Sequence, residues 1–334
     1  MPAGILETDS MFSVRQMPWH GLGVVLDHQP KTIEEAISAA GLDWQVEQRP
    51  VAAVLEKFDD GTMTVDELAG YMANIRSDTG KALGIVTKRY QPVQNREAFA
   101  FLAGIFGSEM HFETAGSLMD GRRVWVLMKI PSWIEIGGDP IGQFAFISNS
   151  HDGKSSVLAA VTPIRIVCAN TEAAALRLAK GVHAQRTYTL RHLGDMTQKI
   201  SEARNVMQVT TRYYEAFKAV GDKLALVKVS DRRAKAKIEE LLPAVEGTGD
   251  RAAKNRQEAR DTVMRILKGE SEGGDTRGNA PGTAWTFYNA AVEYADWYRG
   301  EKKTGGRFQR ALDDPDGLKA KAWEVSLDMA GILN

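Results

Sequence analysis

The first half of the chain alternates short runs of apolar residues with polar, glycine-containing connections, a pattern typical of strands. Several runs lie close together and are joined by pieces such as residues 137–140 and 151–153. Connections this short join antiparallel neighbours, because parallel crossovers need a dozen residues or more. We therefore expect an antiparallel sheet. The predicted strands are residues 49–55, 83–87, 123–130, 143–148, 156–161 and 164–168, the last two being divided by Thr162 and Pro163.

Helices are predicted between and after these strands. In the first, over residues 32–41, Thr32 and Glu35 have the spacing of a capping box, and the apolar positions that follow recur with a helical period. A second helix is expected to begin at Asn95 as its N-cap and to end at Gly107. A third is expected over residues 171–180.

From about residue 194 the period becomes helical almost throughout, which predicts long amphipathic helices. The helix over residues 284–299 is aromatic and apolar nearly all round, and this indicates burial in a core or an interface. The fold class is therefore α+β: an antiparallel sheet with covering helices, followed by a mainly helical C-terminal part. We divide the chain into a sheet domain, residues 1–190, and a helical region packed on it, residues 191–334. Glycine-rich, charged segments near residues 246–250 and 269–282 are expected to be mobile.

Composition places the chain among ordinary globular proteins, with 43% hydrophobic and 25% charged residues in 334. Cys168 is the only cysteine, so a disulfide framework and a zinc site built on several thiolates are both excluded. The six histidines are scattered, and we expect no metal site and no cofactor. Because neither a secretory signal nor a run of about 18 apolar residues is found, we expect a cytoplasmic protein with no membrane contact.

Charge is unevenly distributed although the net charge is only −1. Residues 1–184 carry 16 Lys and Arg against 21 Asp and Glu, whereas residues 185–270 carry 18 against 12. A basic segment in a neutral chain is typical of phosphate binding, and also of long helices whose charges only confer solubility.

The segment from His151 to Ser155 contains Gly-Lys-Ser, which is part of a phosphate-binding loop motif. That motif needs a glycine where this chain has Ser148, and a helix where this chain has strand-like residues. We therefore interpret the segment as a hairpin turn, and Lys154 remains a candidate phosphate contact.

Basic and aromatic residues are interleaved on one predicted strand, where Arg123, Trp125 and Lys129 share a face next to Arg122. Such a face stacks bases and follows a phosphate chain in proteins that bind single strands. The alternative is that Trp125 is covered and that the arginine stems lie over it. Lys88 and Arg89, followed by Tyr90, form a similar cluster.

A candidate anion site follows the last predicted strand. Arg165 precedes a helix whose N-terminus would be capped by Asn170 or Thr171, and free N–H groups at such an end attract anions. The alternative is a plain cap with Arg165 paired to an acidic neighbour. Nothing in the spacing of Cys168 from the histidines supports a nucleophile.

Several segments carry a resemblance to a known family: WHGLG at Trp19, AGLDWQV at Ala40, LGIVTKRYQPVQN at Leu83, SHDG at Ser150, IRIVCANT at Ile164 and GTAWTFYNA at Gly282. With these motifs the chain resembles the phage/plasmid-like protein family, domain of unknown function 932. The resemblance implies a phage or plasmid accessory protein in a bacterial host cell, and it brings no known activity or catalytic residues. A more distant similarity, to phage single-strand annealing proteins, implies an oligomer.

From these observations we predict a homo-oligomeric protein that binds single-stranded DNA, promotes annealing or protects strands, and is not an enzyme. Two alternatives stay open. One is an enzyme acting on a small molecule or nucleotide through His151 and Asp152 near Cys168, and the other is a non-catalytic accessory factor that binds a host protein through the helical half. The predicted nucleic-acid contacts are Lys88, Arg89, Arg122, Arg123, Trp125, Lys154 and Arg165.

Overall fold

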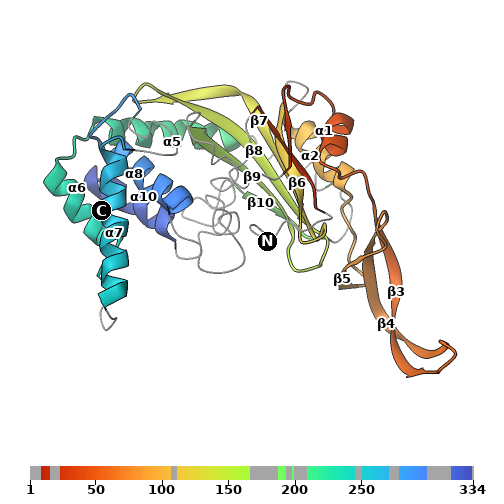
Figure 1. Cartoon of the computed structure of the whole chain (residues 1–334). Coiled ribbons are helices and arrows are strands. Elements are labelled where there is room, and N and C mark those ends of the chain that lie inside the picture. The colour runs from red at the N-terminus through yellow and green to blue at the C-terminus, as the bar shows by residue number, and fades with distance from the viewer. Residues whose placement is uncertain are drawn as a thin grey trace.

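The computed structural model describes residues 9–15, 23–106, 111–165, 187–192, 198, 209–244, 250–270, 278–298 and 317–332. Figure 1 shows two sheets, built mainly from the first half of the chain, and a group of helices from the second half. The predicted fold class, α+β with a mainly helical C-terminal region, is confirmed.

The larger sheet has seven strands in the order β10-β9-β8-β7-β6-β1-β2. All neighbours are antiparallel except β1 and β2, which are parallel. The glycine-containing connection at residues 137–138 joins β7 to β8 as a hairpin, as the sequence predicts. The strands are β1 Met11–Val14, β2 Val24–Leu26, β6 His111–Leu118, β7 Arg123–Ile136, β8 Asp139–Ser150, β9 Val157–Arg165 and β10 Thr187–Leu190.

Strand β9 corrects one prediction, because it runs unbroken through Thr162 and Pro163. Pro163 pairs with Gln143 of β8. On its other side β9 pairs with β10 only over residues 157–160. Among the described strands Pro163 therefore lies on an edge, where a residue without an N–H group interrupts no ladder.

The smaller sheet has three antiparallel strands, β3 Val46–Lys57, β4 Met63–Arg76 and β5 Ala82–Thr87. Strand β4 was not predicted. Because β5 pairs only with residues 71–75 of β4, the far part of the β3–β4 hairpin extends beyond the sheet as a two-stranded ribbon (Figure 1).

Helices α1 Ile33–Ala39 and α2 Asn95–Phe106 cover one face of the larger sheet. The predicted N-cap of α1 is confirmed, since the Thr32 hydroxyl accepts a hydrogen bond from the Glu35 N–H at 3.1 Å. Under these helices, Phe99 and Phe112 share a buried core with Val124 and Val126 of β7.

The helical part comprises α5 Val209–Leu226, α6 Asp231–Leu241, α7 Asp250–Leu267, α8 Ala284–Glu293, the π-helix η3 Tyr294–Tyr298 and α10 Leu318–Met329. It is packed on the sheet through α5, where a Cβ on Gly221 would lie 2.6 Å from Ile136 Cδ1. The predicted burial of the aromatic helix is confirmed, because Trp285 and Phe287 of α8 are buried. The predicted helix over residues 171–180 and most of the two segments expected to be mobile lie outside the described residues.

Candidate nucleic-acid interface

The two sheets meet at the loop after β8, residues 151–156. The Asn74 side chain of β4 donates a hydrogen bond to the His151 carbonyl at 2.7 Å, and the Tyr90 hydroxyl donates to the Ser150 carbonyl at 2.7 Å. A Cβ on Gly84 of β5 would lie 2.6 Å from Asp152 Cα, so the strand and the loop are in direct backbone contact. These contacts fix the start of the loop, and with it the position of Lys154.

His151 is fully buried inside this junction. Its Nε2 lies 3.0 Å from Asn95 Oδ1, and the Asn95 amide group donates to the carbonyls of Leu42 and Trp44. The Asn95 oxygen must therefore accept, so His151 donates from Nε2. The Trp44 ring meets the imidazole edge-on at 5.5 Å. Asn95 is the first residue of α2, and not the N-cap that the sequence predicts. Its side chain connects the helix to the loop through His151.

Burial is also the main reason that the pKa of His151 is lowered from 6.5 to about 3, with the nearby His192 adding to the effect and Asp152 opposing it. The imidazole is consequently neutral at physiological pH. Asp152 does not orient it, since one Asp152 carboxylate oxygen accepts from the Ser150 hydroxyl at 2.5 Å and from the Lys154 N–H at 3.0 Å. Both side chains therefore have a structural role: His151 bonds to Asn95, and Asp152 closes the loop on itself. Cys168 lies outside the described residues.

A second turn, between β6 and β7, holds Arg122 beside this loop. Met119, Asp120 and Gly121 all have positive φ, and the Asp9 carboxylate accepts hydrogen bonds from the N–H groups of Asp120 and Gly121 at 3.1 and 2.9 Å. A carboxylate that satisfies two N–H groups stabilises this strained turn. The Arg122 carbonyl then accepts from the His151 N–H at 2.8 Å. The two turns are therefore bonded to each other.

An open pocket of about 260 Å³ lies against residues 153–156 of the loop. Tyr90 and His192 form one wall, with their rings stacked at 4.4 Å and 22°. Burial, with the charge of Asp152 as a smaller cause, raises the pKa of the Tyr90 hydroxyl above its usual range, so it remains a donor. The rest of the lining is polar and cationic: Thr87, Gly153, Lys154, Ser155, Ser156 and Arg191. Hydroxyl, ammonium and guanidinium groups together suit a phosphate.

Of the predicted cations, one lines this pocket and two others lie in segments that contact it or its loop. Arg89 directly precedes Tyr90, Arg122 is bonded to the loop, and Lys154 lines the pocket. All three are exposed, and within the described part of the chain none of them forms an ion pair. Lys88 lies 4.0 Å from Glu67 and is partly neutralised. Arg123 is half-buried where β7 begins.

Trp125 corrects the sequence-based prediction. Its side chain is 2% exposed and its neighbour on the same face, Leu127, is fully buried, so this face of β7 is covered and offers no open stacking surface. Alternation shows which side chains share a face of a strand, but not whether that face is covered. Arg165 is the last residue of β9, and its side chain lies outside the described residues, as do Asn170 and Thr171.

Arg191 and His192 are two pocket residues, from a distant segment, that the sequence did not indicate as contacts. They follow β10 and reach the pocket because the Gln91 N–H donates to the His192 carbonyl at 2.8 Å. That contact spans about a hundred residues of sequence, and no local pattern could have predicted it.

The described part is thus a mixed α+β protein whose cationic pocket lies where two sheets join. The chain belongs to the family described as Domain of unknown function (DUF932), whose model matches residues 82–314. This confirms the resemblance found in the sequence. No curated protein and no solved structure matches the chain.

The residues that match the family model begin at the start of a strand. This strand is β5, and the matched residues include Arg89, Arg122, Lys154 and the whole lining of the pocket, whereas the β3–β4 hairpin precedes them. Two motifs that carry the resemblance, the one starting at Leu83 and the one starting at Ser150, are in contact at the junction of the sheets. Among the described helices, none is both long and apolar enough to cross a membrane.

Proposed function

We propose that this protein binds single-stranded DNA, with a phosphate of the strand in the pocket beside Tyr90 and His192. The observation that carries the proposal is the pocket itself, in which Lys154 and three hydroxyl groups line one concave surface. Arg89 directly precedes Tyr90 of the lining, and the Arg122 carbonyl is bonded to His151 of the loop. Neither cation has an ion-pair partner among the described residues, so their charges are available to neighbouring phosphates.

A single strand suits this geometry better than a duplex. The pocket, of about 260 Å³, is concave and lies against residues 153–156 of the loop, and a flexible backbone bends more readily into such a space than a duplex does. Recognition would rest mainly on phosphates, because the rings of Tyr90 and His192 are largely buried and Trp125 is covered. The proposal therefore implies little sequence preference.

The salt dependence of binding is expected to be modest. Three cations, Arg89, Arg122 and Lys154, would each neutralise one phosphate, so the logarithm of the association constant should fall with the logarithm of salt concentration with a slope near about −2. Fluorescence anisotropy of labelled oligonucleotides between about 50 and 200 mM salt measures this slope. Equal or tighter binding of a duplex at every salt concentration would contradict a single-strand site.

Replacing Arg122 and Lys154 together by alanine is expected to weaken single-strand binding about tenfold or more at low salt and to make the slope shallower by about 1.4. The matched control replaces Arg251 and Lys254, exposed cations on α7 at the other end of the molecule (Figure 1). Because the control removes the same charge, an equal loss in both variants would mean that binding depends on overall charge, and the pocket would not be the site.

A further inference from the structure

The β3–β4 hairpin exposes apolar side chains on the two-stranded part that extends beyond β5. Six of them are between 42% and 65% exposed: Val54, Leu55, Phe58, Met63, Val65 and Leu68. Val54 and Val65 are directly opposite in the ladder, so they form a continuous apolar patch. A two-stranded ribbon is marginal in water without such packing, and an exposed patch of this kind is typical of an interaction site.

The end of the hairpin is acidic as well as apolar. Residues 55–67 contain five carboxylates and one cation, Lys57. Phe58 lies at the turn, where its carbonyl accepts from the Gly61 N–H at 3.0 Å. Asp60 is used within the turn, since it accepts from the N–H and hydroxyl of Thr62, whereas the exposed Asp59 forms no ion pair with a described residue. The partner of this end should therefore be both apolar and basic.

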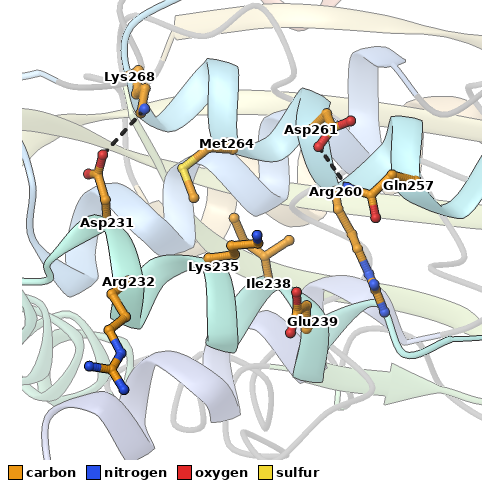
Figure 2. A pocket seen from close by; sticks show the side chains of 10 residues that line it. All are labelled: Asp231, Arg232, Lys235, Ile238, Glu239, Gln257, Arg260, Asp261, Met264 and Lys268. Carbon is orange, nitrogen blue, oxygen red and sulfur yellow. Dashed lines mark hydrogen bonds and ion pairs between the residues drawn. The ribbon is translucent and has the colours of Figure 1, made fainter.

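A groove of that character lies between α6 and α7. Figure 2 shows Ile238 and Met264 between the two helices, with Lys235 beside them. The groove has a volume of about 490 Å³, and its walls carry four cations against three carboxylates. Asp231 is already paired with Lys268 at 3.3 Å, while Arg232 and Lys235 form no ion pair within the described part of the chain. Net positive charge is therefore available beside Met264, which is half-buried, whereas Ile238 beneath it is buried.

One copy cannot bring these two features together. The hairpin projects from one end of the molecule, and α6 and α7 form the opposite end (Figure 1). We infer that the hairpin end of one copy docks in the α6–α7 groove of a second copy, with Phe58 over Met264 and with Asp59 facing Lys235. Aromatic–thioether contact and opposite charges both favour this pairing.

The contact is head-to-tail, because the two surfaces differ. Such heterologous contacts repeat from copy to copy and give closed rings or open filaments, unlike the two-fold dimer formed by a self-complementary patch. The inference does not rest on nucleic-acid binding, since neither surface includes the pocket beside Tyr90. It gives the predicted homo-oligomer a specific interface.

Light scattering after size exclusion tests the inference on the full chain. The unmodified protein should form assemblies whose size rises with concentration. A hairpin variant, Phe58→Ser with Asp59→Lys, and a groove variant, Arg232→Glu with Lys235→Glu, should each be monomeric, with association weakened about tenfold or more. Asp59, Arg232 and Lys235 are polar and exposed, and the Phe58 side chain is exposed as well. The melting temperature measured by circular dichroism should therefore be unchanged in both variants. The matched control, Trp133→Ser with Glu135→Lys on β7, makes the same changes at another exposed site and should assemble normally.

Mixing the hairpin variant with the groove variant gives the decisive result. Each retains one intact surface, so the mixture should form a one-to-one dimer and nothing larger. A monomeric unmodified protein, a groove variant that assembles normally, or a mixture that stays monomeric would each overturn the inference.

Discussion

Replacing Trp285 by alanine is expected to lower the free energy of unfolding by about 3–5 kcal/mol, the range for truncating a large buried aromatic residue. Trp285 is 2% exposed and lies edge-on to Phe217 of α5 at 6.1 Å. Its indole N–H donates to the buried Asp139 carboxylate at 3.2 Å, and the other carboxylate oxygen accepts from the Asn279 N–H at 2.8 Å. The residue therefore connects the β7–β8 turn to the helical part.

Urea denaturation followed by circular dichroism measures this effect. Trp285→Phe is the control, because it keeps most of the apolar contact and removes only the N–H donor; a loss of about 1–3 kcal/mol is expected for that variant. A loss below about 1 kcal/mol for Trp285→Ala would mean that α8 does not hold the helical part on the sheet.

The free energy of unfolding is expected to be about 2 kcal/mol lower at pH 5 than at pH 7 because of His151 alone. The pKa of this imidazole is about 3 in the folded protein, against 6.5 when it is exposed. Below pH 6.5 the unfolded chain binds a proton that the folded chain excludes. Stability from this residue is therefore complete above about pH 6.5 and falls progressively as the pH approaches 3.

The variant His151→Asn isolates this contribution, since asparagine does not titrate. It should be less stable than the unmodified protein at pH 7, but the loss of stability between pH 7 and pH 5 should be about 2 kcal/mol smaller. The same pH dependence in both proteins would show that His151 is accessible to protons in the folded protein, and would contradict its burial.

Features encoded by neighbouring residues were predicted correctly from the sequence. The cap of α1 depends on Thr32 and Glu35, three positions apart, and the β7–β8 hairpin depends on two consecutive glycines. The burial of the aromatic helix follows from Trp285 and Phe287, which leave it with no polar face. In each case the pattern itself specifies the physical outcome.

Strand β4 shows where the pattern fails. Its residues from Met63 to Ala69 are exposed on both faces, so there is no buried side to impose an alternation of apolar and polar positions. The strand exists because it pairs with β3, a contact that no local period reveals. At Pro163 the sequence predicted a break in a strand that is continuous. A proline is compatible with a strand only at an edge, and the sequence does not show that this position lies at an edge.

The candidate site could be predicted only in part. Arg89, Arg122 and Lys154 were identified because cations next to strands are visible in the sequence. The contact between the segments that carry them depends on distant pairs such as Asn74 with His151 and Tyr90 with Ser150. Trp125 is buried because other parts of the chain cover its face of the sheet. The sequence of β7 alone does not show whether that face is covered.

The most direct test of the proposed function is a photo-cross-link from the pocket. With p-benzoylphenylalanine placed at Ser155, an exposed residue of the pocket lining, illumination should join the protein to labelled single-stranded DNA, and excess unlabelled strand should suppress the product. The same group placed at Ala253, exposed on α7, should give little product. Cross-linking at Ser155 and not at Ala253 is the predicted result; equal cross-linking at both positions, or none at Ser155 under conditions where the strand binds, would contradict a site in this pocket.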